Sequence, residues 1–394
     1  MKQIGVATEK AMEQPLWTRD FILVCLANLC IFMGLHTLMP VVPVYTVELA
    51  GSEAWAGIIA GGFTFSAVLI RPLTGNLLDR YGRKGVFLVG ILLFFSCALA
   101  YLWVPSLLIF FVLRFLHGFG WGISSTGANT IATDIIPKSR MGEGMGFFGL
   151  TGTFSMAVAP ALGLEIMADF GFDTAFTMAV VFGVVAFLVA LPIKCMKLEP
   201  NGQDVKTSAI EKEALFPGLI MLFLTITYGS VLIFIALYAA ERQVENIGLF
   251  FTAFALALLF SRPYFGRLTD RKGYEAAVLP GILAIFLAIF ILYLAHSLLA
   301  FLLAGFIYGI GFGAAQPALQ AMAVRNVDPS RRGAANATFL LCFDSGFGLG
   351  TIAWGFLVDI FGYDYIYLFA LIPTLIALVL FLKASRKASW KVSG

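Results

Sequence analysis

Twelve long apolar stretches follow one another along this chain, separated by short polar connections. They cover approximately residues 18–44, 54–75, 85–104, 106–134, 143–168, 174–194, 215–239, 247–267, 276–296, 299–324, 334–359 and 364–383. A helix needs about 20 apolar residues to cross a bilayer. Only 12% of the 394 residues are charged, against about a quarter in soluble domains. The sequence therefore predicts an all-α membrane protein with twelve transmembrane helices, and it excludes a soluble enzyme and a nucleic-acid-binding protein.

The basic residues predict which helix ends face the cytoplasm. If the N-terminus is inside, 22 of the 26 Lys and Arg residues lie in cytoplasmic segments, three lie within spans and only Arg242 lies outside. Positively charged loops remain in the cytoplasm, so we expect both termini on the cytoplasmic side of the inner (plasma) membrane. The polar residues 195–214 then form a cytoplasmic linker between two six-helix bundles, residues 1–194 and 215–394.

The two halves of the chain repeat one another at an offset of 191 residues. Between residues 71 and 83, seven of thirteen positions are identical to their counterparts in the second half, where chance gives about one. The identical pairs include Asp79 with Asp270, and at the same offset Gly118 matches Gly309. A parallel repeat of this kind indicates two similar bundles about an axis along the membrane normal, with a central site between them.

Residues 75–84 read GNLLDRYGRK, and residues 266–273 read GRLTDRKG. The first resembles the signature loop between spans 2 and 3 of the major facilitator superfamily, and the second resembles its degenerate copy. The resemblance covers residues 17–384. It implies two pseudo-symmetric six-helix bundles around a central cavity, and a monomeric transporter whose partners are a small-molecule substrate, protons and the lipid bilayer.

Asp79 lies at the cytoplasmic end of span 2, on the same side as the start of span 11 near Gly333. A carboxylate is stabilised beside a helix N-terminus, which carries a partial positive charge. We predict that Asp79 contacts that start and that Asp270 contacts the start of span 5 near Glu143. The resemblance implies that these contacts close the cytoplasmic side; alternatively, the charges only keep the loop in water. The predicted gating residues are Gly75, Asp79, Arg80, Gly82, Arg83, Asp270 and Arg271.

Four side chains are candidates for proton coupling or substrate binding. Asp344 lies about ten residues into span 11, near mid-membrane, where a carboxyl group can take up and release a proton. Arg114 lies about 12 Å into span 4, in a stretch, RFLHGFGWG, that resembles the span 4 motif of proton-coupled exporters. His36 in span 1 and Glu165 in span 5 are the other two. The alternative for each is a structural residue with satisfied hydrogen bonds.

Span 5 carries a row of small residues and a proline, including Gly152, Pro160 and Gly163. The row resembles the antiporter motif of this span, although Ala159 and Leu164 replace two of its glycines. Physically it provides a smooth face, which we expect to pack against span 8. The aromatic residues Trp121, Tyr228 and Tyr308 are candidates for lining the cavity, although packing between helices also explains them.

We predict a proton-coupled secondary transporter that exports small amphipathic molecules, as in multidrug efflux. The alternative is a proton-linked carrier of a defined metabolite such as a sugar, an organic acid or a metal chelator. No nucleotide-binding loop of an ATP-driven pump occurs, and the three histidines and five cysteines lack the spacing of metal ligands or catalytic groups. We therefore expect no cofactor, no metal and no enzymatic activity. A channel is hard to reconcile with the paired signature loops.

Overall fold

The computed structural model describes residues 15–50, 53–104, 106–195 and 210–385. Within these ranges it contains no strand, and twelve helices are long and apolar enough to cross a membrane, which confirms the predicted fold class. The helices are α2 (Arg19–Ala50), α3 (Glu53–Tyr81), α4 (Arg83–Ala100), α5 (Leu107–Ile135), α6 (Met141–Phe170), α7 (Phe172–Ala190), α8 (Lys212–Glu241), α9 (Gly248–Lys272), α10 (Glu275–Leu294), α11 (Leu298–Arg325), α12 (Arg332–Phe361) and α13 (Ile366–Ser385).

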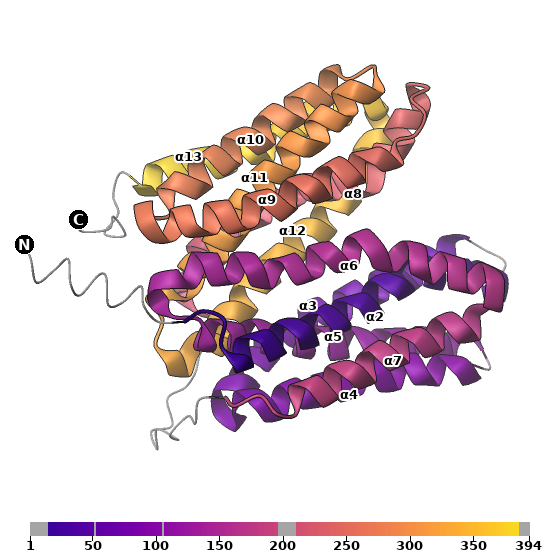
Figure 1. The fold of residues 1–394 in the computed structure, drawn as a ribbon. Helices are drawn as coiled ribbons and strands as arrows, with labels where there is room; N and C mark the ends of the chain where they lie inside the picture. The colour runs from indigo at the N-terminus through magenta and orange to yellow at the C-terminus, as the bar shows by residue number, and fades with distance from the viewer. Residues whose placement is uncertain (1–14, 51–52, 105, 196–209, 386–394) are drawn as a thin grey trace, which may run out of the picture.

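Helices α2 to α7 form one bundle and α8 to α13 form the other (Figure 1). Across the interface α6 packs against α9, and α3 packs against α12. The 191-residue repeat extends to the backbone, because Gly82 and Gly273 have φ angles of 91° and 84°. Residues with a side chain rarely adopt such φ angles, so both glycines are needed where α3 and α9 stop.

Helices α3 and α9 are longer than the hydropathy pattern indicated. The predicted spans ended at residues 75 and 267, whereas α3 continues to Tyr81 and α9 to Lys272. The predicted boundaries were therefore wrong, because a helix that leaves the apolar layer continues through polar residues until a glycine stops it. Asp79 and Asp270 consequently project from the last turns of helices and not from loops.

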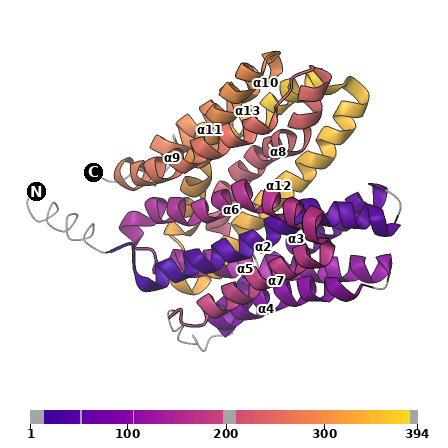
Figure 2. The ribbon, with the colours of Figure 1, turned by 45° about the vertical axis from the view of Figure 1, so that its right-hand side comes forward.

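We call the end of the molecule where α3 stops and α12 begins the motif end, and the opposite end the far end. In the described part of the chain, the hydrogen bonds and ion pairs between the bundles lie on the motif side, between the motif end and mid-helix. Towards the far end the bundles separate (Figures 1 and 2). The two bundles are therefore joined at one end.

Candidate functional site

The predicted contact between Asp79 and the start of α12 is present. The two carboxylate oxygens of Asp79 accept hydrogen bonds of 2.9 Å from the backbone N–H groups of Gly333 and Ala334. The helices approach so closely that a Cβ atom added to Gly75 would lie 2.8 Å from the Cβ of Ala337. Small residues are therefore required here for a carboxylate to reach the positive end of the helix.

Buried charges surround this contact. The guanidinium of Arg83, which is 1% exposed, donates to Asp79 at 2.6 Å, to Asp134 at 3.0 Å and to the carbonyl oxygen of Pro329 in the other half. Arg332 of α12 donates to Asp134 at 3.1 Å and to the carbonyl oxygen of Thr133 at 2.9 Å. We call Asp79, Arg83, Asp134 and Arg332 the first clasp. Sequence analysis did not include Asp134 and Arg332 in it.

The repeat of this contact joins α9 to α6. Asp270 accepts hydrogen bonds of 2.8 Å from the N–H groups of Gly142 and Glu143, as the pseudo-symmetry predicted. The Glu143 carboxylate in turn accepts from Arg140 at 2.7 Å and from Arg267 at 2.7 Å. We call Asp270, Glu143, Arg140 and Arg267 the second clasp. Of the other predicted gating residues, Arg80 and Arg271 are exposed and belong to neither clasp.

Deeper in the interface, Asp344 of α12 forms an ion pair with Arg71 of α3. Two guanidinium nitrogens of Arg71 lie 2.7 Å and 2.6 Å from one carboxylate oxygen of Asp344. Arg71 is also held in its own bundle, because it donates to the hydroxyl groups of Ser125 and Thr126 on α5. Asp344 lies about 18 Å along α12 from its start, and its side chain is 19% exposed. The pair therefore links the two bundles near mid-membrane.

The counterpart of Arg71 in the repeat has a different environment. Arg262 of α9 donates to Gln316 of its own bundle at 2.7 Å and faces Gly149 of α6. Thr153 occupies the position equivalent to Asp344, so Arg262 has no ion pair with a described carboxylate although it is buried. Of the two equivalent arginines, only Arg71 therefore forms an ion pair with a described acid of the other bundle.

On the repeat axis the two bundles meet through equivalent residues. Gln320 of α11 donates from its side-chain amide to the amide oxygen of Asn129 on α5, and these positions are 191 residues apart. Both side chains are buried. The hydrogen bond therefore lies on the pseudo-twofold axis, between the two clasps and the Arg71–Asp344 pair.

The three aromatic candidates have different surroundings. The Tyr228 ring stacks on Phe312 with centroids 4.5 Å apart, and its hydroxyl lies 3.9 Å from the sulfur of Met156 in the other bundle. Trp121 is half-buried against Phe32. Tyr308, in contrast, is fully buried inside the C-terminal bundle, where its hydroxyl bonds that of Thr227. Tyr228 therefore lies between the bundles, whereas Tyr308 is a packing residue of one bundle.

The remaining three candidates lie away from the Arg71–Asp344 pair. His36 of α2 hydrogen-bonds Ser155 of α6 at 2.9 Å within the N-terminal bundle. Arg114 is buried in the same bundle, with its guanidinium 4.5 Å above the Phe63 ring and 3.3 Å from a ring nitrogen of His117. Glu165 is exposed near the far end of α6. The position of a residue along its helix does not give the direction in which its side chain points, so these contacts could not be predicted from the sequence.

The small residues of α6 pack against two different helices, α9 and α2. Gly146 and Gly149, which belong to the predicted row, face α9 as expected, and Gly142 before them also faces α9. The expectation was wrong for Gly152 and Gly163, which face α2, because Cβ atoms there would lie 3.3 Å from the Phe32 ring and 2.5 Å from the carbonyl oxygen of Thr37. The reason is the helical period, which turns the second half of the row towards the other side. Pro160 lies inside α6.

No group of three or more His, Cys, Asp or Glu side chains in the described ranges has the geometry of a metal site. Among the described helices, the contacts between the bundles include ion pairs, an amide pair and an aromatic ring, and Asp344 is the acid that lies near the middle of its helix.

Comparisons with known proteins agree with this architecture. The sequence profile of the Major Facilitator Superfamily matches residues 24–245 and 218–394. The quinolone resistance protein NorA of Staphylococcus aureus is 23% identical over 347 residues, which are 84% of this chain and 87% of NorA. The human organic anion transporter MFSD10 has a similar structure, with a TM-score of 0.79 at 17% identity, over 93% of this chain and all of that one. The fucose:proton symporter FucP of E. coli, in its outward conformation, also gives a TM-score of 0.79 at 16% identity, over 95% of this chain and all of FucP.

Proposed function

This chain belongs to the Major Facilitator Superfamily and is a membrane transporter, not an enzyme, and from this premise we propose that it exports small amphipathic molecules in exchange for protons. The observation that carries the proposal is the ion pair between Arg71 and Asp344. The relatedness to NorA, a quinolone resistance protein, supports export of drug-like substrates.

The ion pair provides a way for a proton to change how the bundles are joined. While Asp344 is ionised, it attracts Arg71, which Ser125 and Thr126 hold in the other bundle. A proton on Asp344 removes the negative charge and with it the Coulomb attraction across the interface, which is strong in a low-dielectric setting. Protonation therefore favours separation of the bundles near mid-membrane. Since only one state can bind the proton tightly, proton binding shifts the population between states.

We assign the motif end to the cytoplasm. The excess of Lys and Arg at the α3–α4, α5–α6 and α11–α12 connections supports this orientation. With both clasps formed at that end and the bundles apart at the far end (Figure 1), the structure then corresponds to an outward-facing state. Its similarity to FucP in the outward conformation supports this assignment.

The test of the proposal is transport by the Asp344→Asn variant. Reconstituted protein is given an imposed pH gradient, and the movement of a fluorescent quinolone such as norfloxacin is followed together with the internal pH. The wild type should drive both fluxes, and Asp344→Asn should lose gradient-driven transport because the amide cannot bind the proton. The variant should retain the normal yield and elution profile.

The matched control removes an acid that has no place in the proposed switch. Asp173 is exposed in the first turn of α7, so Asp173→Asn should keep wild-type transport. Full gradient-driven activity in Asp344→Asn would remove this residue from the mechanism, and a quinolone flux without any proton flux would refute proton coupling.

One observation favours a second candidate, a carrier of organic anions. Arg262 is a buried cation between the bundles with no ion pair to a described carboxylate, and an unpaired charge at this depth is costly. A substrate carboxylate could neutralise it, and the structural similarity to an organic anion transporter is consistent with that role. Arg114, which is also a candidate for substrate binding from the sequence, points into one bundle instead. Uptake of fluorescein, an anionic dye, that Arg262→Gln abolishes would favour this candidate over quinolone export.

A further inference from the structure

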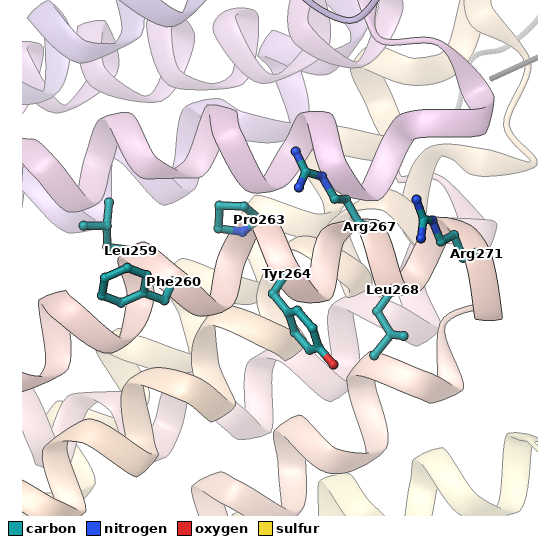
Figure 3. Close-up of a pocket in the computed structure, with 7 residues that line it drawn as sticks. All are labelled: Leu259, Phe260, Pro263, Tyr264, Arg267, Leu268 and Arg271. Atoms are coloured by element: carbon teal, nitrogen blue, oxygen red, sulfur yellow. The ribbon is translucent and has the colours of Figure 1, made fainter. Parts of the chain in front are cut away.

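The surface of α9 carries a groove with a volume of about 380 Å³ near the motif end (Figure 3). Its walls are apolar along most of its length, and exposed rings of Phe260 and Tyr264 line it together with Pro263. Arg267 and Arg271 line its other end. A groove with an apolar part and a cationic end matches a ligand with an acyl chain and an anionic headgroup.

The dimensions of the groove match one leaflet of a bilayer. It extends from Leu259 to Arg271, twelve residues of helix, or about 18 Å. One leaflet contributes about 15 Å of hydrocarbon. The two arginines therefore lie at the depth of the headgroups when the rings lie among the chains.

The charge at this end is not fully neutralised within the protein. Arg267 donates to Glu143 at 2.7 Å, yet its side chain is 58% exposed. Arg271 is exposed and forms no ion pair with a described acid. The acids that face this end are Glu143, which pairs with Arg267 and Arg140, and Asp270, which accepts backbone N–H groups of α6. One positive charge thus remains available for a phosphate.

The repeat gives an internal comparison. The equivalent positions on α3 hold Leu69, Leu73 and Asn76 in place of Phe260, Tyr264 and Arg267. The two rings and Arg267 are therefore specific to α9, and the architecture that the two halves share does not require them.

We propose that the α9 groove binds an anionic phospholipid of the cytoplasmic leaflet, with its phosphate on Arg267 and Arg271 and one acyl chain along Phe260 and Tyr264. The leaflet assignment rests on the orientation in the proposed function; the binding chemistry does not. Basic pockets on transmembrane helices at the cytoplasmic side attract anionic headgroups. The bound headgroup then lies next to Glu143 and the second clasp.

The test compares two lipids with identical chains. The purified full-length protein in detergent is titrated with dioleoyl phosphatidylglycerol or dioleoyl phosphatidylcholine, and bound lipid is counted by native mass spectrometry. We expect phosphatidylglycerol to bind at least about fivefold more tightly, the effect of about one basic residue. Glycerol phosphate, which has no acyl chain, should compete weakly at equal concentration.

Two variants locate the site. Arg271→Gln should lower phosphatidylglycerol affinity about fivefold, whereas Lys272→Gln, which removes the neighbouring exposed charge outside the groove, should leave it unchanged. Equal affinity for the two lipids, equal losses in the two variants or no loss in Arg271→Gln would each overturn the proposal. Because no transport is measured, such a failure would leave the proposed function standing.

Discussion

The two clasps join the same pair of bundles through the same backbone contact, but the charges around that contact differ. In each, an aspartate at the end of one helix accepts two N–H groups at the start of another. In the first clasp the supporting cations are buried, since Arg83 is 1% and Arg332 4% exposed. In the second clasp the cation that crosses the interface, Arg267, is 58% exposed.

The repeat shows where this difference originates. The positions equivalent to Arg83 and Asp134 are Tyr274 and Arg325, which form a cation–π contact of 5.5 Å within one bundle. The buried ion pair between Arg83 and Asp134 in the first half thus corresponds, in the second half, to a contact between a cation and an uncharged ring. Because buried pairs depend strongly on both partners whereas exposed pairs contribute little, we expect the first clasp to hold the motif end closed more firmly.

The largest effect should follow from Arg332→Gln. This change removes the cation that connects α12 to Asp134 and to the carbonyl oxygen of Thr133, and truncating one partner of a buried, hydrogen-bonded charge pair costs about 2–5 kcal/mol. The motif end should open in a large fraction of molecules. Spin labels on the exposed positions Gly85 and Lys383, one on each bundle, would report a longer distance.

The control for this variant is Arg325→Gln, which removes an arginine at the same end whose described partner, Tyr274, lies in its own bundle. Its label distances should equal those of the unsubstituted protein. If Arg332→Gln leaves the distribution unchanged as well, the first clasp does not hold the motif end closed and the comparison between the clasps loses its basis.

An intermediate effect should follow from neutralising the two aspartates. Asp79→Asn and Asp270→Asn each remove a carboxylate from a helix start, an interaction of about 1–2 kcal/mol when partly buried. Asp79→Asn should open the motif end further, because it also takes one of the two carboxylates away from buried Arg83. The same pair of spin labels measures both variants, and a larger opening in Asp270→Asn would reverse the proposed order of the clasps.

The contacts that could be predicted from the sequence are those that the repeat and the signature residues define locally. Asp79 and Gly333 lie at helix ends on the same side of the membrane, so charge and helix direction suffice to bring them together. The ion pair of Asp344 with Arg71 was not predicted, because hydropathy gives the depth of a residue along a helix but not the direction in which it points. The repeat contained one signal for this pair. Arg71 matches Arg262 at the offset of 191 residues, whereas Asp344 matches Thr153, so only one of the two arginines has an acid available at the equivalent position.

Arg114 and the α6 glycines illustrate the same restriction. Arg114 points towards Phe63 and His117 inside one bundle and not between the bundles. The row of small residues in α6 begins on the α9 side at Gly142 and ends against α2 at Gly163. Which neighbour a face meets depends on how twelve helices pack together, and that information is not contained in the periodicity of any one of them.

The smallest effect should follow from Arg267→Gln in the second clasp. The ion pair with Glu143 is exposed on the arginine side, and exposed pairs contribute at most about 1 kcal/mol. In detergent without anionic lipid, the spin-label distances should therefore change little at low salt. Screening weakens such a pair further, so raising the salt concentration should remove the remaining difference from the unsubstituted protein, whereas the effect of Arg332→Gln should persist. An opening as large as that of Arg332→Gln would mean that the exposure of the arginine does not determine the strength of a clasp. Arg267 and Arg332 would then contribute equally to the backbone contact that the two clasps share.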